Sequence, residues 1–410
     1  MSRSEKQFLG RGTTGLASGA FDTPEKENIM IRKTILNRLH HAVCAFGFLI
    51  SLAALPAFGQ HVHQLSYNGS TWEDQSLGGG QAYVFSQIAS ILTTPNNQEH
   101  VYYFAGNPYH VHQLFYNGTN WSDEDLTAET GAAEPNEYAV AAFSIGNYQY
   151  VYYTDLNFDL HQLLYNNSNW ADTDLTKIVG GPQSSGQLVA FTTSPAIHVF
   201  YTDVNSGHIH QIFNTNGTNW QDQDLTLITG GASTDGNGMS GFNIGNYQYI
   251  YFLDFSGHVH QYLYNNSNWS DEDLTILTNS SSPVPGNNLN AFVLPGTKKL
   301  RVYVQDENNH ILQLASTNNV KWSSSDLTKK TKTPPTFPGT SIAGLNTANQ
   351  LGVYYMSGQS HVNQFLLPSH ATAWQNIDLT EESGGAGVTP YGGISVLSLQ
   401  NLPSVFYLGD

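Results

Sequence analysis

Residues 110–127 read HVHQLFYNGTNWSDEDLT, and this phrase indicates a repeat architecture because it occurs in seven variants along the 410-residue chain. Each variant contains one of the seven tryptophans of the chain, and consecutive tryptophans are 49 to 53 residues apart. A period of about 50 residues is typical of β-propeller blades. The other copies are HVHQLSYNGSTWEDQSL (61–77), DLHQLLYNNSNWADTDLT (159–176), HIHQIFNTNGTNWQDQDLT (208–226), HVHQYLYNNSNWSDEDLT (258–275), HILQLASTNNVKWSSSDLT (310–328) and HVNQFLLPSHATAWQNIDLT (361–380).

Each period contains four segments with the character of a β-strand. In one repeat they are AVAAFSIG (139–146), QYVYYTD (149–155), LHQLLYN (160–166) and NWADTDLT (169–176), rich in β-branched and aromatic residues. Asn-Gly pairs at 68–69, 117–118 and 216–217, and Asn-Asn pairs at 166–167 and 265–266, fit tight turns between the last two strands. These turns also explain the N-x-S/T sequences at the same places without glycosylation.

The two ends of the repeat region complete one another. The first copy begins at a third strand, near His61, and the chain ends in VFYLGD (405–410), a second strand. Pairing of these strands would close the ring and leave no unpaired edge at the chain ends. The sequence therefore predicts an all-β fold, a seven-bladed β-propeller of four-stranded antiparallel blades, closed by pairing of the N- and C-terminal strands over residues 60–410.

Residues 1–59 have the pattern of an N-terminal leader with a signal peptide. Basic residues (Arg32, Lys33 and Arg38) precede an apolar run of 14 residues from Ala42 to Leu55, and small residues follow up to Gly59. A transmembrane helix needs about 20 apolar residues, so the run favours a cleaved signal over a membrane anchor. We expect a secreted protein, extracellular or periplasmic, whose translation starts at Met1 or Met30. The single cysteine, Cys44, lies in this leader, which excludes disulfides and a thiol nucleophile in the mature chain.

The charge excludes nucleic acid as a partner. Residues 60–410 carry 8 basic and 28 acidic residues, a formal charge of −20 (8 − 28). Such a surface repels phosphate backbones and anionic lipids.

Two residue types recur in all seven copies and are candidates for carbohydrate binding. A buried amide must find several hydrogen-bond partners, so a repeated glutamine has either a structural role between blades or a ligand role. A repeated tryptophan either packs between blades or offers its face to a sugar ring, and both can hold for one indole. The glutamines are Gln64, Gln113, Gln162, Gln211, Gln261, Gln313 and Gln364, and the tryptophans are Trp72, Trp121, Trp170, Trp220, Trp269, Trp322 and Trp374.

Histidines form a third repeated set, and four copies contain a His-x-His pair. Alternation along a strand places both rings of a pair on one face. This is a spacing that suits a metal, but zinc needs three or four ligands, so hydrogen-bonding histidines in a polar groove are the favoured interpretation and no metal or other cofactor is predicted. The histidines included among the carbohydrate-binding candidates are His63, His112, His161, His210 and His260.

The Asp-x-Asp-Leu-Thr ending of the phrase resembles a calcium loop only superficially, because it lacks the glycine turn and the distal glutamate. We expect the aspartate to cap a turn while the leucine packs inward.

The combination of V-Y-Y, H-V-H-Q-L, W and D-L-T resembles the blade repeat of the fungal fucose-specific lectins and related bacterial propeller lectins, over nearly all of residues 61–410. The resemblance implies sugar sites between blades, formed by an arginine before V-Y-Y, a glutamate in the next strand and an aromatic residue. Here the seven glutamines occupy the glutamate position, and only Arg301 keeps the arginine. Arg301 with Gln313 and Trp322 is therefore the expected pocket most similar to the family, whose members are usually six-bladed.

The sequence favours a lectin, a secreted multivalent protein that binds glycans or glycoconjugates without catalysis. A propeller scaffold for protein partners is the alternative, because the connections between repeats differ from blade to blade. A secreted hydrolase comes third. Catalysis normally needs one constellation that breaks the symmetry, and the repeats contain no candidate catalytic residue of this kind.

Overall fold

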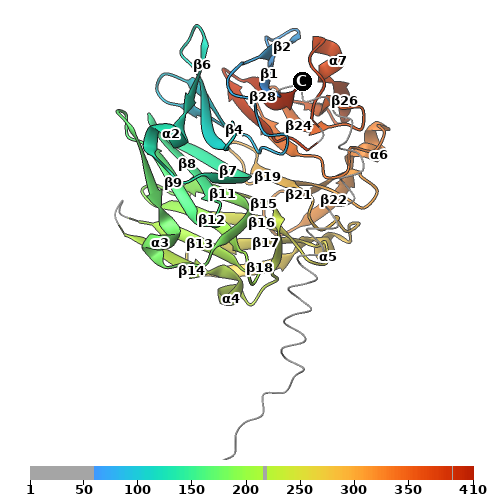
Figure 1. The fold of residues 1–410 in the computed structure, drawn as a ribbon. Helices are drawn as coiled ribbons and strands as arrows, with labels where there is room; N and C mark the ends of the chain where they lie inside the picture. Colours follow the sequence, from blue (N-terminus) through green and yellow to red (C-terminus); the bar gives the residue numbers. More distant parts are fainter. Residues whose placement is uncertain (1–59, 216–218, 390) are drawn as a thin grey trace, which may run out of the picture. The chain divides into compact units, whose positions relative to one another are not determined.

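The computed structural model describes residues 60–215, 219–389 and 391–410, and these residues form seven four-stranded antiparallel sheets arranged as the blades of a β-propeller (Figure 1). The innermost strands are β3 (Ala89–Thr93), β7 (Pro135–Ile145), β11 (Ser184–Thr192), β15 (Thr234–Ile244), β19 (Leu289–Val293), β23 (Ile342–Asn346) and β27 (Ile394–Leu399). The second strands are β4 (Gln98–Ala105), β8 (Tyr148–Asp155), β12 (Ile197–Asp203), β16 (Tyr247–Asp254), β20 (Leu300–Gln305), β24 (Gln350–Met356) and β28 (Leu402–Gly409).

The third and fourth strands carry the repeated phrase. The third strands are β5 (His110–Tyr116), β9 (Leu160–Tyr165), β13 (Ile209–Asn214), β17 (Val259–Tyr264), β21 (Ile311–Ser316), β25 (Val362–Pro368) and β1 (His61–Tyr67). The fourth strands are β6 (Trp121–Asp125), β10 (Trp170–Asp174), β14 (Trp220–Asp224), β18 (Trp269–Asp273), β22 (Trp322–Asp326), β26 (Gln375–Asp378) and β2 (Trp72–Ser76). Blades 1 to 6 begin at β3, β7, β11, β15, β19 and β23, and blade 7 consists of β27, β28, β1 and β2.

Blade 7 closes the ring as the sequence predicts. Its strand order is β2-β1-β28-β27, so it contains both ends of the propeller. Strand β1 pairs antiparallel with β28, with His61 opposite Gly409 and Ser66 opposite Ser404. The closing blade therefore has the same four-stranded form as the six blades built from consecutive strands.

A short helix follows the fourth strand in blades 1 to 6, where the sequence predicts only a capped turn. In blade 2 the Asp174 side chain accepts a hydrogen bond from the Lys177 amide, which caps the helix N-terminus. Leu175 is fully buried, and the Thr176 hydroxyl accepts from the Leu160 amide at 2.8 Å. The helices are α2 (Leu126–Thr130), α3 (Leu175–Val179), α4 (Leu225–Thr229), α5 (Leu274–Thr278), α6 (Leu327–Thr331) and α7 (Leu379–Ser383).

The turns between third and fourth strands follow the predicted chemistry. Gly69 and Gly118 have φ of 100° and 93°, and Asn167 and Asn266 adopt 74° and 72°. The preceding asparagine side chains accept backbone hydrogen bonds, as Asn117 does from Thr119 at 2.9 Å. The turn at Asn216 and the leader of residues 1–59 lie outside the described residues.

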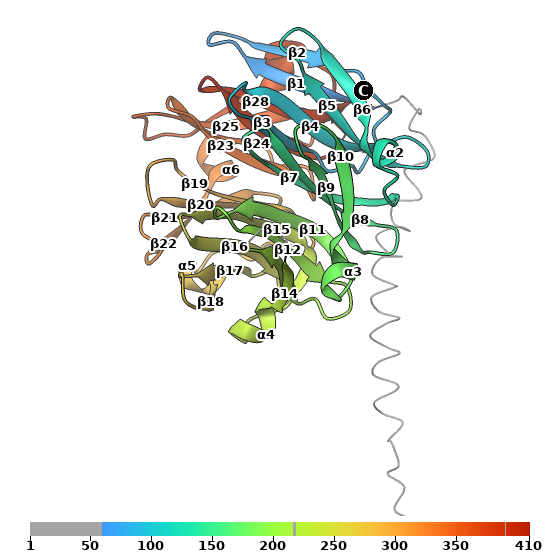
Figure 2. The same cartoon turned by 90° about the vertical axis from the view of Figure 1, so that its left-hand side faces the viewer.

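The hydrophobic core lies between blades. Each of seven clusters of buried side chains joins two neighbouring blades and includes one repeated tryptophan, taken from the later blade of the pair. Trp170 of blade 2, for example, meets Tyr102 of blade 1 edge to face, with ring centroids 6.4 Å apart. The predicted packing role of the tryptophans is confirmed. Strands β12 of blade 3 and β16 of blade 4, which contribute to one of these clusters, lie side by side (Figure 1 and Figure 2).

Candidate functional site

The third strand of each blade presents its repeated residues to two different neighbours. In blade 3, Gln211 lies opposite Phe200 and Gln223, whereas His210 lies opposite Tyr201 and Asp224. Successive residues of a strand point to opposite faces. The glutamine therefore faces the next blade, and the histidine faces the preceding one.

A groove with a volume of about 550 Å³ lies between blades 3 and 4. Blade 3 contributes His198, Gln211 and Gln223, and blade 4 contributes Gln248 and the Trp269 indole. A repeated glutamine and a repeated tryptophan thus meet in one groove, but they come from neighbouring blades. The other lining residues are Thr193, Phe213, Thr215, Ile228, Asn246, Tyr264, Asn266, Ser267 and Asn268.

A chain of hydrogen bonds forms the polar wall of this groove. The Gln223 amide donates to the Gln211 oxygen, and Gln211 Nε2 donates to Gln248 Oε1 at 2.8 Å. Gln211 Nε2 also lies 2.7 Å from His198 Nδ1, and His198 Nε2 lies 2.8 Å from the Thr193 hydroxyl. Because Gln211 donates to Nδ1, the His198 proton is on Nε2.

His198 is neutral in this arrangement. Burial lowers its pKa from 6.5 to about 4. Protonation at Nδ1 would also set an N–H against the donor amide of Gln211. The wall of the groove therefore presents neutral imidazole and amide groups across the physiological pH range.

The boundary between blades 1 and 2 repeats this polar wall. His100 Nδ1 lies 3.1 Å from Gln113 Nε2, and His100 Nε2 lies 3.3 Å from the Thr93 hydroxyl. Burial lowers the pKa of His100 from 6.5 to about 4. Glu124 stands opposite Gln113 where blade 3 has Gln223, and the buried Gln113 Oε1 has no hydrogen-bond partner among the described residues. Blade 1 therefore differs from blade 3, where the Gln223 amide donates to the equivalent oxygen of Gln211.

The other repeated glutamines bond to tyrosines or to a carboxylate. Gln162, Gln261, Gln313 and Gln364 each pair with the hydroxyl of the tyrosine opposite, at 2.7, 2.9, 3.2 and 3.1 Å. Gln64 donates to Glu99 of blade 1 at 2.8 Å. All the glutamines except the half-buried Gln313 are at most 8% exposed, so their structural role is clear, and contact with a ligand is restricted to amide edges.

The tryptophans differ in how much of the indole solvent can reach. Trp72 and Trp170 are buried, at 6% and 8% exposed. The rest are half-buried, and they are Trp121, Trp220, Trp269, Trp322 and Trp374.

The prediction of a pocket formed by Arg301, Gln313 and Trp322 is wrong for Trp322. Trp322 packs edge to face on Tyr251 of blade 4, with centroids 6.2 Å apart, whereas Trp374 of blade 6 packs on the cluster of Tyr303. Arg301 Nη1 donates to the Leu300 carbonyl at 2.8 Å, and burial lowers its pKa. Its buried Nε has no acceptor within the described part of the chain. The sequence could not show from which blade the aromatic partner comes.

The candidate histidines lie on the face of the third strand opposite to the glutamines. Neither His210 nor His260 is among the residues that line the groove between blades 3 and 4, so their grouping with the groove glutamines is wrong for this groove. Each of the five candidate histidines bonds through Nδ1 to an aspartate of the fourth strand, which in blades 1 to 4 is the first aspartate of the Asp-x-Asp pair. The five Nδ1 to carboxylate distances are 2.9 to 3.0 Å, and the pairs are His63 with Asp74, His112 with Asp123, His161 with Asp172, His210 with Asp222 and His260 with Asp271.

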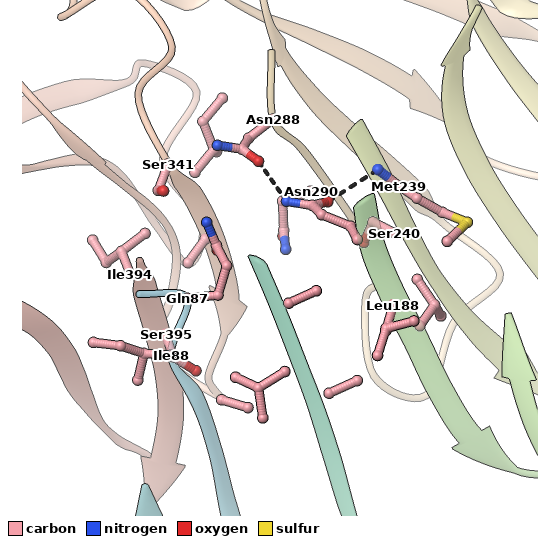
Figure 3. A pocket seen from close by; sticks show the side chains of 18 of the residues that line it. Gln87, Ile88, Leu188, Met239, Ser240, Asn288, Asn290, Ser341, Ile394 and Ser395 are labelled. Atoms are coloured by element: carbon pink, nitrogen blue, oxygen red, sulfur yellow. Dashed lines mark hydrogen bonds between the residues drawn. The ribbon is translucent and has the colours of Figure 1, made fainter. Parts of the chain in front are cut away.

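A central cavity of about 330 Å³ lies among the innermost strands and has no counterpart in the sequence-based predictions (Figure 3). Apolar side chains such as Ile88, Leu188 and Ile394 line it together with Asn288 and Ser341. Its residues come from seven innermost strands but do not repeat in type, so no repeated motif could have revealed it.

None of the helices in the described ranges has the length and apolar character needed to cross a bilayer.

No family model and no curated protein matches the chain.

Solved structures of propeller lectins resemble the fold. The BP39L lectin of Burkholderia pseudomallei is 16% identical, with a TM-score of 0.57, over 80% of this chain and 98% of that chain. The Aleuria aurantia lectin, solved with α-methyl-L-fucoside, is 19% identical, with a TM-score of 0.51, over 72% of this chain and 95% of that chain. The Aleuria protein is a six-bladed propeller that recognises fucose. At these identities the likeness establishes the propeller fold, and the seventh blade is a difference from the Aleuria protein.

Proposed function

We propose that this protein is a secreted, non-catalytic lectin that binds glycans in several grooves between its blades. The groove between blades 3 and 4 carries the proposal, because a neutral polar wall of Gln211 and His198 faces the half-buried indole of Trp269 across one opening. Neutral sugars bind where planar polar groups lie beside an aromatic face. The likeness to propeller lectins that bind fucosides supports the same class of ligand.

The boundaries between blades differ in their polar residues, so we expect them to differ in sugar specificity. The boundaries of blades 1 with 2 and of 3 with 4 share the threonine, histidine and glutamine wall, whereas Tyr150 and Tyr249 stand at the histidine position in blades 2 and 4. We expect sugar to bind with similar specificity at these two histidine-walled boundaries. Two linked weak sites can increase avidity on a glycan-bearing surface by about a hundredfold without any new contact.

Two features support secretion and the absence of catalysis. The basic and apolar pattern before Gly59 is that of a signal peptide. The groove between blades 3 and 4 is lined by no carboxylate and no cysteine among its described residues, so it lacks the paired carboxylates of most glycoside hydrolases and a thiol nucleophile. Its histidine, His198, is held neutral by burial, which lowers its pKa to about 4.

A glycan array with a blocked groove tests the proposal. Ser267 is exposed at the groove between blades 3 and 4, so Ser267→Trp fills the opening without removing a core side chain. The matched control is Ser282→Trp, an exposed serine in the connection between blades 4 and 5. We expect the wild type and the control to retain the same glycans, and Ser267→Trp to lose signal at least fivefold.

Two results would refute the proposal. One is a wild-type array without any retained glycan at high protein density. The other is equal binding by Ser267→Trp and the wild type, which would remove the groove from the account even if the protein remained a lectin.

A further inference from the structure

Two histidines and two aspartates meet in blade 4, on the face opposite to Gln261. His258 immediately precedes β17 and His260 lies within it, Asp254 ends β16, and Asp273 ends β18. His258 Nδ1 lies 2.7 Å from Asp273 Oδ2. His260 Nε2 lies 3.6 Å from Asp254 Oδ2 and 3.9 Å from Asp273 Oδ2. Asp254, His258 and His260 thus offer three ligand atoms within 4.8 Å of one another, and Asp273 of β18 contacts both histidines.

Backbone hydrogen bonds fix the orientation of both carboxylates. Asp254 Oδ1 accepts from the amides of Ser256 and His258 at 2.8 and 2.7 Å. Asp273 Oδ1 caps helix α5 by accepting from the Ile276 amide at 2.9 Å. Each aspartate thus uses one oxygen for the backbone and turns the other toward the histidines.

A further carboxylate fixes the orientation of His260. Asp271 lies 3.0 Å from His260 Nδ1, so the Nδ1 proton is donated to it. The lone pair of Nε2 then faces the two Oδ2 atoms, which are also acceptors. A carboxylate that holds one imidazole nitrogen while the other binds a metal is the usual outer shell of metal-ligating histidines.

We propose that Asp254, His258, His260 and Asp273 bind one divalent transition-metal ion of the zinc type. Two imidazole nitrogens and two carboxylate oxygens suit Zn²⁺, which prefers four ligands about 2.0 to 2.2 Å away. Ligand atoms of such a tetrahedral site lie about 3.3 Å apart. The three histidine–aspartate contacts, 2.7 to 3.9 Å long, lie on both sides of this value, and the ligand atoms of Asp254, His258 and His260 lie within 4.8 Å of one another. The side chains therefore need to draw together to complete the site.

The equivalent positions of other blades explain why blade 4 is singled out. In blade 1, His110, His112 and Asp125 come together, but Ala105 ends the second strand, which leaves three ligands. In blade 3, Asp203 stands at the place of Asp254, but its Oδ2 already accepts from the Ser206 hydroxyl.

The site is accessible and separate from the proposed sugar groove. The His258 side chain is 29% exposed, whereas the His260 side chain is 9% exposed. An ion can therefore enter past His258 and bind to the more buried imidazole of His260. The metal would tie together the ends of three strands at the rim of the blade. Sugar binding and metal binding are therefore expected to fail independently of one another.

Cobalt titration of the full chain, purified without a polyhistidine tag and treated with chelator, tests the site. We expect the visible absorption of tetrahedral Co²⁺, displacement of Co²⁺ by one equivalent of Zn²⁺, and a higher Tm with Zn²⁺. Asp254→Asn keeps the Oδ1 acceptor and removes the charge, and it should weaken Co²⁺ binding at least tenfold. Asp203→Asn in blade 3 is the matched control and should leave binding unchanged.

The proposal is overturned if the wild type binds neither ion at 100-fold molar excess, or if Asp254→Asn binds as tightly as the control. The Tm of each variant without metal shows whether it is folded. If Asp254→Asn is unstable, His258→Gln provides the same test, because the His258 side chain is half-buried at the edge of the site.

Discussion

Acidification should destabilise the propeller through His198, which is only 5% exposed. Its pKa is about 4 in the folded protein, because burial disfavours the charged ring, and 6.5 when the ring is solvated. Above pH 6.5 the His198 ring is neutral in both the folded and the unfolded chain, so the protein has its full stability with respect to this ring. As the pH falls from 6.5 toward 4, the unfolded chain takes up a proton that the folded chain does not, so stability is lost in this window.

The magnitude follows from the two pKa values. One pKa unit is worth about 1.4 kcal/mol, so the difference between 6.5 and about 4 amounts to roughly 3 kcal/mol. The variant His198→Asn removes the titrating ring and keeps an acceptor for Gln211. Its free energy of unfolding should therefore fall less than that of the wild type between pH 8 and pH 4, by roughly 3 kcal/mol.

Urea denaturation of both proteins at several pH values between 8 and 4 measures this difference. NMR titration of the His198 ring protons gives the folded pKa directly. Parallel pH profiles for wild type and variant, or a folded pKa near 6.5, would show that the ring is not held neutral by its surroundings. His100 offers an independent repeat of the test in blade 1, because burial lowers its pKa to the same value of about 4.

Three further predictions concern the blades themselves. Gln211→Leu should lower the free energy of unfolding by about 2 kcal/mol in urea denaturation, because His198 and Gln248 lose a buried partner; a neutral effect would contradict this. Asp174→Ala should lower the free energy of unfolding by about 1 kcal/mol, because it removes the N-cap of α3, and Asp174→Asn should restore most of this stability. Equal losses in both variants would show that the cap is not the cause. Deletion of Leu402–Gly409 should abolish the cooperative unfolding transition, because β1 loses its partner; a truncated chain with wild-type Tm would show that closure is dispensable.

The repeat made the architecture predictable. Seven copies of one phrase fixed the number of blades, and the incomplete first and last copies fixed the closure between β1 and β28. The short helices were missed although their signals are present in blade 2. Asp174 is the cap and Gly180 ends the helix with φ of 63°, but five residues are too few to show a helical period.

The contacts between strands were not predictable from the spacing within one phrase. His258 and Asp273 are 15 residues apart, and only the register of the antiparallel strands brings them to 2.7 Å. In the same way, the phrase contains a glutamine and a tryptophan, but the pleat turns them toward different neighbours. Gln211 therefore meets Trp269 of the next blade in the groove, and not Trp220 of its own.

The most direct test of the lectin proposal is a crystal structure of the protein soaked with the glycan that the array retains best. We expect sugar in the groove between blades 3 and 4, with its hydroxyls at Gln211 or Gln248 and a ring face near Trp269, and a second molecule beside Gln113. Sugar confined to the central cavity or to the connecting loops, with these grooves free of ligand at saturating concentration, would contradict it.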